Sequence, residues 1–345
     1  MTPPLLPEQQ KTLTVFCPLG LSNRLRVLLS GLCLAEASGR QFKMLWPLTP
    51  ACAAPFADLF ANRWPVVTVD AAEAVGLPYI SGWFGALPDL LLADEQDVVV
   101  GYPSWLVQPE KFPQHAALDA RCQALFAELT PAPPILRSVA AFRREYFRPT
   151  MIGVHLRRGD LLRQRPDATG NTAQAFELVD RYLEKYADAG ILLCTDDGAV
   201  DPNTGRQLPK EGVRQKFSQR YGGRVVGASP RSLDRRTAEA VQDALVDLWL
   251  LRSTDAFVGT ETSSFSEMAV YGREVPYEMC AGGSLAYQRW ERVAKAVGLF
   301  QVVKEFGRRQ VGRDLAFAVL WPYYWRRPFR RALGWVRKLR SRSGR

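Results

Sequence analysis

The residues best suited to chemistry lie in one short stretch, residues 152–160, which reads IGVHLRRGD. An apolar run opens it, and charged side chains follow at once, as they do where a buried strand ends in a ligand-binding crevice. Side chains alternate along a strand, so we expect His155 and Arg157 to point one way and Arg158 the other. An arginine fork binds two phosphate oxygens at once, which predicts a phosphate site. The alternative is a strand end whose arginines pair with surface carboxylates.

A second stretch able to bind anions is the turn Thr262–Ser266, which reads TSSFS. It opens an expected helix, so its free N–H groups and hydroxyls could hold phosphate oxygens. Ser263, Ser264 and Phe265 are therefore candidate binding residues. The alternative is ordinary capping, because Ser and Thr begin many helices.

Strands and helices alternate along the chain and must position these residues. In the first half we expect strands at 12–17, 42–46 and 97–102, a turn at 18–23, and helices at 24–38 and 135–147. In the second half we expect strands at 151–156, 191–194, 224–226, 256–259 and 275–279, and helices at 173–187, 213–221, 237–252 and 264–271.

This order predicts an α/β fold with two Rossmann-like domains facing each other across a cleft. The turn-rich residues 130–134 could mark their boundary. We therefore expect a first domain at 12–148, a second domain at 149–303 and a tail at 304–345. The polar loops 198–212 and 227–236 are expected near the cleft.

Cysteine usage and hydropathy narrow the class of protein. The six cysteines form no CxxC pair and no zinc-site spacing with histidine, so we expect reduced thiols in a cytosolic protein. No uninterrupted apolar run reaches about 18 residues, and residues 1–11 do not resemble a signal peptide.

Positive charge is concentrated in residues 304–345, which hold thirteen Lys or Arg and two Asp or Glu. The net charge of the whole chain is +10, so residues 1–303 sum to −1. Arginines alternate there with tryptophan and tyrosine, a composition that fits a segment lying on anionic lipid. The alternatives are a helix packed on the body of the protein and a nucleic-acid arm.

Four segments in order resemble the GDP-fucose-dependent fucosyltransferase superfamily, which includes the α1,6-fucosyltransferases and the nodulation fucosyltransferases. Gly20–Leu25 (GLSNRL) is similar to its GxGNR-type turn, with Ser22 where glycine is usual. His155–Asp160 (HLRRGD) resembles its HxRRxD motif. Thr195–Asp197 and Asp247–Ser266 resemble its later segments.

The resemblance implies a GT-B fold and inverting, metal-independent transfer from GDP-fucose, with no resident cofactor. It implies that Arg157 and Arg158 replace a metal ion in stabilising the departing diphosphate. It assigns guanine recognition to His155 and Asp247; the alternative for Asp247 is a solvent-facing position. The remaining nucleotide-sugar contacts that it implies are Gly20, Asn23, Arg24, Asp196, Asp197, Ser263, Ser264 and Phe265. For Asp196 and Asp197 the resemblance implies either orientation of the arginines or contact with the nucleotide, and a strand-to-helix cap is the alternative.

The catalytic base is not fixed by the sequence. Some relatives carry a glutamate shortly after HxRRxD, but residues 161–167 read LLRQRPD. Asp167 is the substitute that we expect, whereas Asp160 is expected to hold an arginine. If neither aspartate serves as the base, the reaction relies on departure of the leaving group with little assistance from a base.

These observations predict a bacterial glycosyltransferase with a cell-surface saccharide acceptor, lipid-linked or free. We expect it in the cytoplasm, peripheral on the inner face of the cytoplasmic membrane and held there through residues 304–345. The alternatives are a transferase for another nucleotide sugar and a non-catalytic nucleotide-sugar binder. Nucleic acid is not expected as a partner, because nucleic-acid binding would leave HLRRGD and TDD unexplained.

Overall fold

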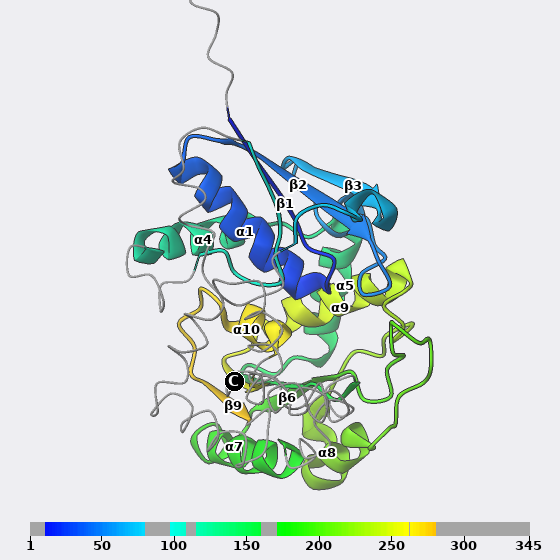
Figure 1. The fold of residues 1–345 in the computed structure, drawn as a ribbon. Helices are drawn as coiled ribbons and strands as arrows, with labels where there is room; N and C mark the ends of the chain where they lie inside the picture. Colours follow the sequence, from blue (N-terminus) through cyan, green and yellow to red (C-terminus); the bar gives the residue numbers. More distant parts are fainter. Residues whose placement is uncertain (1–10, 80–96, 108–114, 160–170, 262, 281–345) are drawn as a thin grey trace, which may run out of the picture. The chain divides into compact units, whose positions relative to one another are not determined.

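The computed structural model describes residues 11–79, 97–107, 115–159, 171–261 and 263–280, which form two parallel β-sheets flanked by helices (Figure 1). The first sheet has the order β3-β2-β1-β4. Its strands are β1 (Thr12–Phe16), β2 (Gln41–Leu48), β3 (Val66–Asp70) and β4 (Val98–Gly101). Helices α1 (Leu21–Ala37), α2 (Phe56–Leu59), α4 (Ala116–Glu128) and α5 (Pro133–Tyr146) and the 3-10 turn η1 (Ala71–Ala74) belong to this half of the chain.

The second sheet has the order β7-β6-β5-β8-β9, and all its strand pairs are parallel. Its strands are β5 (Met151–Leu156), β6 (Gly190–Thr195), β7 (Val225–Val226), β8 (Ala256–Thr260) and β9 (Tyr277–Cys280). The helices of this half are α7 (Asn171–Lys185), α8 (Val213–Tyr221), α9 (Ala238–Leu251), α10 (Ser264–Val270) and the 3-10 turn η4 (Gly222–Arg224).

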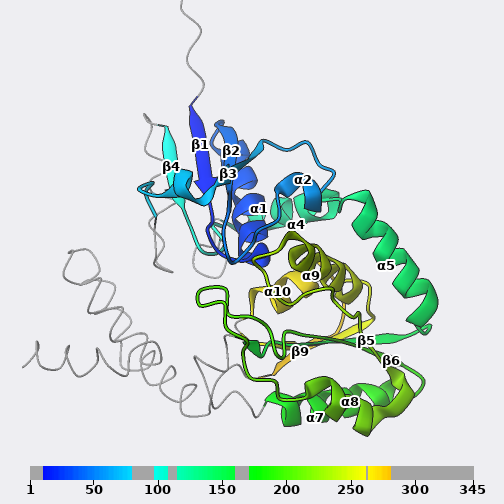
Figure 2. The ribbon, with the colours of Figure 1, turned by 90° about the vertical axis from the view of Figure 1, so that its right-hand side faces the viewer.

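The central strands of the second sheet are buried on both faces. Every residue of β5, β6 and β8 is buried, as expected for parallel strands covered by helices on both sides. Ile152 and Val154 face the cluster that contains α7 and α8, whereas Met151 faces the cluster that contains α9 and α10. The helices accordingly lie in two layers, with α7 and α8 on one side of the sheet and α9 and α10 on the other (Figure 2).

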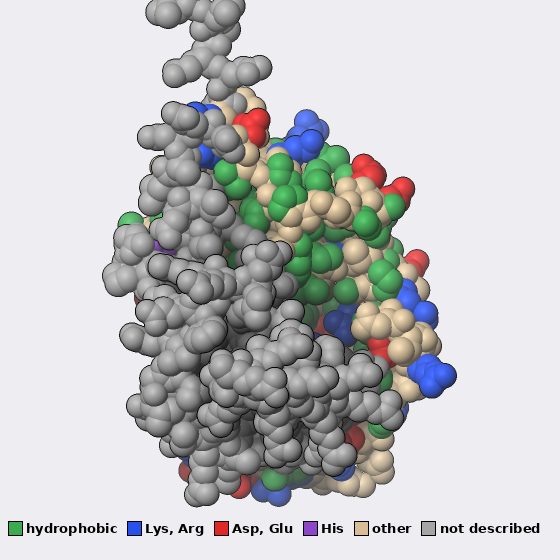
Figure 3. Space-filling view, viewed as in Figure 1, with side chains coloured by type: hydrophobic (Ala, Val, Ile, Leu, Met, Phe, Trp, Pro, Cys, Tyr) green, Lys and Arg blue, Asp and Glu red, His purple; other side chains and the backbone are tan. Residues whose placement is uncertain are grey.

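The first sheet packs against α1 and shares its hydrophobic core with the second. Leu13, Val15 and Met44 belong to the same buried cluster as Leu248 and Phe257. Hydrophobic side chains also reach the surface over this sheet (Figure 3), and the exposed ones include Val67 of β3 and Val99 of β4.

The expected elements are present, but α2 and η1 were not expected, and three further differences have a physical reason. Helix α1 begins at Leu21 rather than Arg24, because Gly20 is extended and its carbonyl already accepts the N–H groups of Asn23 and Arg24. The sequence analysis missed β3, which is an edge strand with much of its surface exposed, and α4, whose apolar spacing is weak because it buries few side chains. The predicted domain boundaries stay predictions.

Candidate functional site

His155 lies on β5 and faces α10, as the alternation along the strand predicts. Its Nδ1 lies 2.7 Å from the Ser266 hydroxyl, and its ring packs against Phe265 with centroids 4.8 Å apart. Burial lowers the pKa of His155 to about 4, with Asp196 opposing the shift and Arg157 adding to it. The imidazole is therefore neutral at pH 7, with one nitrogen donating and one accepting.

A hydrogen-bond network fixes the backbone at the end of β5. The Thr260 hydroxyl donates to the His155 carbonyl (3.0 Å) and accepts the Arg157 N–H (3.0 Å). The Ser266 hydroxyl accepts the Thr260 N–H (2.9 Å) and also lies in hydrogen-bond contact with His155 Nδ1. β8 and α10 therefore orient both His155 and the start of the arginine pair.

Asp196, at the end of β6, fixes the backbone that follows Arg157. Its Oδ1 accepts the backbone N–H groups of Arg158 and Gly159. A methyl group on Gly159 would lie 2.6 Å from Asp196 Oδ2, so only glycine leaves room for this contact. Of the roles that the sequence left open for Asp196, orientation of the arginine segment is the one that these contacts support.

Arg158 lies in the interior rather than at the sheet edge. Its side chain is fully buried on the α7 and α8 side of the sheet, where it donates to the Thr172 hydroxyl. Its Nε lies 3.7 Å from Glu211 Oε2. This follows from strand alternation, which sends Arg158 into the interior and leaves Arg157, half-buried, at the sheet edge. In this conformation Arg158 contacts Thr172 and Glu211, and its contact with a ligand stays a prediction.

Asp197 is likewise a structural residue in this conformation. Its two carboxylate oxygens accept the N–H groups of Glu211 (2.7 Å) and Val213 (2.9 Å) at the start of α8. Asp197 therefore caps a helix, as the alternative predicted. The helix is α8, which begins 16 residues further along the chain, after a loop.

Asp247 brings a carboxyl group to the same face of the sheet as His155. Its Oδ1 is buried, and no residue in the described part of the chain forms a hydrogen bond with it. Burial raises the pKa of Asp247 to about 7, against opposing effects of Arg214 and of a hydrogen bond from Cys194. Cys194 pairs in register with His155, so both side chains emerge on one face. The solvent-facing alternative is wrong for this oxygen.

The first turn of α10 supplies further polar groups beside His155. Ser263 is buried and its hydroxyl accepts the Ser266 N–H at 3.5 Å, which makes it the cap of this helix. Ser264 and Phe265 are half-buried in the first turn, where backbone N–H groups have no partner inside the helix. Ser263 is therefore the capping residue, and ligand binding by Ser264 and Phe265 stays a prediction.

The Gly20 turn lies at the amino end of α1. Asn23 is half-buried, whereas Arg24 is fully buried: its Nε donates to the Leu19 carbonyl (2.7 Å) and its Nη2 to the Thr49 hydroxyl (2.9 Å). A methyl group on Gly20 would make only ordinary contacts, the nearest at 3.7 Å, so the protein itself does not require glycine there.

Arg26 was missed by the sequence analysis. It is buried on α1 and forms an ion pair with Glu267 of α10. Burial lowers the pKa of Arg26 to about 9; the Cys17 thiol opposes the shift and the Arg157 cation adds to it. Arg26 therefore lies near Arg157. No local sequence motif could show this, because Arg157 and Glu267 are both far from Arg26 along the chain.

Comparison with known proteins identifies the fold. No protein-family model matches the sequence, and a search of curated proteins finds no significant match. Solved structures do match. The NodZ α-1,6-fucosyltransferase soaked with GDP-fucose is 16% identical, with a TM-score of 0.50 over 76% of this chain and 93% of that one. The fucosyltransferase NodZ from Bradyrhizobium is 17% identical, with a TM-score of 0.50 over 76% of this chain and 92% of that one.

A mutant of FUT1 from Arabidopsis thaliana, in complex with GDP, is 13% identical, with a TM-score of 0.50 over 79% of this chain and 71% of that one. This chain has the GT-B fold of these fucosyltransferases. At such low identity the likeness establishes the fold and leaves the activity to be argued from the site.

Within this GT-B fold, several predicted residues lie outside the part of the chain that the structure describes. They are Asp160, Asp167, Thr262 and the tail 304–345. Among the described residues, no group of three or more His, Cys, Asp or Glu side chains is placed to hold a metal ion. In the same residues, no helix is both long and apolar enough to span a membrane.

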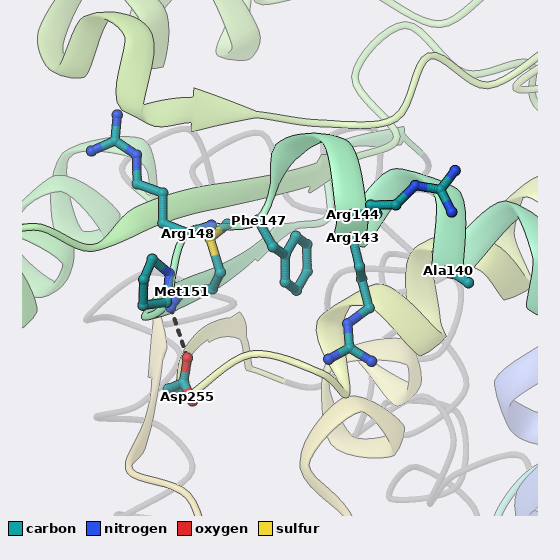
Figure 4. A pocket seen from close by; sticks show the side chains of 8 residues that line it. Ala140, Arg143, Arg144, Phe147, Arg148, Met151 and Asp255 are labelled. Carbon is teal, nitrogen blue, oxygen red and sulfur yellow. Dashed lines mark hydrogen bonds between the residues drawn. The ribbon is translucent and has the colours of Figure 1, made fainter.

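A pocket of about 400 Å³ lies at the other end of the second sheet, where β5 begins (Figure 4). Arg143, Arg144 and Arg148 line it, together with Asp255, whose Oδ2 accepts the Met151 N–H at 2.8 Å. The three guanidinium groups point in different directions (Figure 4), so they do not converge on one ligand. Ligands of α/β sheets bind at the opposite, carboxyl edge.

Proposed function

We propose that this protein is an inverting, metal-independent glycosyltransferase that transfers fucose from GDP-fucose to a saccharide acceptor. The observation that carries the proposal is the unpaired Asp247 Oδ1 on the same sheet face as the neutral His155, in a fold shared with fucosyltransferases solved with GDP or GDP-fucose. A buried acceptor without a donor is costly, and a ligand N–H would satisfy it.

Guanine fits these two groups by its hydrogen-bonding pattern. Its N1–H and amino group are adjacent donors, which an ionised Asp247 carboxylate accepts together. In this proposal the Ser266 hydroxyl donates to His155 Nδ1, so the Nε2–H of His155 supplies a donor for an acceptor atom of the nucleotide. Uracil, cytosine and thymine do not present two adjacent donors in this way, so the pair should favour GDP.

The diphosphate is expected at the edge formed by β5 and α10. Arg157 is the half-buried cation there, and the first-turn N–H groups of Ser264 and Phe265 add donors. Negative charge grows on the diphosphate as the C1–O bond of fucose breaks. Arg157 stabilises that charge, and Arg26, which lies near it, adds to the local positive field.

The transfer itself exchanges one bond for another. The acceptor hydroxyl oxygen forms a bond to C1 on the face opposite the diphosphate, GDP leaves with the electrons of the old bond, and the hydroxyl proton passes to a base. Asp167 remains our candidate for that base and Asp160 for a group holding an arginine.

Our proposals for the acceptor and for the location in the cell rest on the composition of residues 304–345 rather than on the site. We infer a bacterial cell-surface saccharide, lipid-linked or free, reached from the cytoplasmic face of the membrane. The basic and aromatic residues 304–345 would hold the enzyme on anionic lipid and so raise the effective concentration of a membrane-borne acceptor.

The test is release of nucleoside diphosphate from a panel of donors in the presence of a chelator. GDP-fucose, GDP-mannose and UDP-galactose would be compared in wild type and in Arg157→Ala. We expect release from GDP-fucose alone, unchanged by the chelator. Release from another donor would keep the transferase and replace the sugar, whereas full inhibition by the chelator would contradict metal independence.

A non-catalytic nucleotide-sugar binder remains the second candidate, favoured by the lack of glutamate in residues 161–167. Tight GDP binding without release from any donor, across a range of saccharide acceptors, would establish it.

A further inference from the structure

Positive charge gathers at the amino end of α1, where the guanidinium of Arg24 lies over the Trp46 ring. Arg24 uses Nε and Nη2 in hydrogen bonds to Leu19 and Thr49, but its Nη1 is fully buried and has no hydrogen-bond partner among the residues that the structure describes. The same holds for the Ser22 hydroxyl in this turn. Burial lowers the pKa of Arg24, and the groups that oppose this shift are the thiols of Cys52 and Cys17, with no carboxylate among them.

A second arginine reaches this turn from the loop that precedes α9. A methyl group built on Gly20 would lie 3.7 Å from Arg235 Nη1, and the Arg235 carbonyl accepts the Ala53 N–H at 3.3 Å. The neighbouring carboxylate, Asp234, is already paired with Arg236 at 2.7 Å. Arg235 is half-buried, and its guanidinium makes no hydrogen bond or ion pair with any residue that the structure describes.

Arg24 and Arg235 both lie near the Cys52 thiol. Burial raises the pKa of Cys52, and the cations that oppose the rise are Arg24 and Arg235. The seventeen-residue helix α1 points its amino end, with its unpaired N–H groups and partial positive charge, at the same turn. The two guanidinium groups and the partial positive charge of the helix amino end would all attract an anion bound beside this turn.

We propose that Arg235 binds an anionic ligand group, a phosphate or a carboxylate, at the amino end of α1. Arg235 makes the contact because it is partly exposed, and the buried Arg24 contributes through its charge. The identity of the ligand rests on the proposed function: the anion is either the donor diphosphate or an acidic substituent of the acceptor. The existence of the anion site does not depend on that function.

The experiment is calorimetric titration of the full-length protein with inorganic pyrophosphate, alongside thermal unfolding without ligand. Arg235→Gln removes the charge and Arg235→Lys keeps it. Arg144→Gln is the matched control, because Arg144 is an exposed arginine of the pocket on the far side of the sheet and its loss changes the net charge equally.

We expect Arg235→Gln to weaken pyrophosphate binding at least tenfold, as the loss of one charge-assisted hydrogen bond implies, and Arg235→Lys to restore part of it. Arg144→Gln should bind like wild type. The unfolding midpoint of Arg235→Gln should stay the same or rise, because an unbalanced cation has been removed from a helix amino end.

Three results would overturn the proposal: wild type that does not bind pyrophosphate, unchanged affinity in Arg235→Gln, or an equal loss in Arg144→Gln.

Competition between GDP and pyrophosphate identifies the source of the anion. If GDP displaces pyrophosphate, the site belongs to the donor. If both bind together, it belongs to an acidic acceptor. If GDP does not bind at all, the proposed function fails while the pyrophosphate result stands.

Discussion

Asp247 is the residue whose ionisation should be visible in both stability and binding. Its folded pKa of about 7 lies above the usual aspartate value near 4. Between these values the native state holds a proton that the unfolded state releases, so this group lowers stability as pH rises from about 4 to 7. The same ionisation prepares the carboxylate to accept two guanine N–H groups.

We therefore expect opposite effects of pH on the free and bound protein. Without ligand, Asp247→Asn should gain stability relative to wild type as pH rises from 5 to 8, measured by urea denaturation. GDP affinity of wild type should rise over the same range, and the variant should bind GDP at least tenfold more weakly at pH 8. Parallel stability profiles for the two proteins would show that Asp247 is not buried as described.

Arg157 and Arg158 are neighbours with different expected roles. Arg157→Ala should reduce turnover by about 10²–10³ while leaving the unfolding midpoint near that of wild type, because it removes one stabilising contact to the leaving group. Arg158→Ala should instead lower the midpoint, since it removes a fully buried side chain that holds Thr172 and Glu211. Steady-state kinetics and thermal unfolding of both variants separate the roles; a reversal of the two effects would contradict them.

At the scale of elements, the sequence was most informative where burial is complete. Residues 151–156 were placed correctly because a continuous apolar run is typical of a parallel strand covered on both faces. β3 was missed because its exposed edge has no such run. The strand period also implied that His155 and Arg158 diverge, but only the structure shows that Arg158 ends in the interior. Arg26 had no signal in the sequence, and Arg235 had only its place in the polar loop 227–236, because the surroundings of both residues come from distant segments.

Asp197 links two elements, the end of β6 and the start of α8. Asp197→Ala should cost about 1–2 kcal/mol of stability and speed amide hydrogen exchange in residues 198–213, because two N–H groups lose their acceptor. Asp188→Ala is the matched control, an exposed aspartate after α7. Exchange in 198–213 that is equally slow in both variants would mean that other contacts hold this segment.

At the scale of the whole molecule, charge is divided between a near-neutral body and a basic tail. Truncation after residue 303 should move the protein from the membrane pellet to the soluble fraction while preserving activity on soluble acceptors. Circular dichroism of the truncated protein is the control for folding. A folded, truncated protein that still sediments with membranes would show that the tail is not the anchor.

The most direct test of the central claim is thermal stability of the purified protein against GDP, UDP, CDP and dTDP. A ligand at about 100 times its dissociation constant adds about 2.7 kcal/mol of stability, which is readily measured. We predict stabilisation by GDP alone, lost in Asp247→Asn and weakened in Arg157→Ala. Stabilisation by another nucleotide in place of GDP, or by none of the four, would contradict the assignment of this site to GDP-fucose.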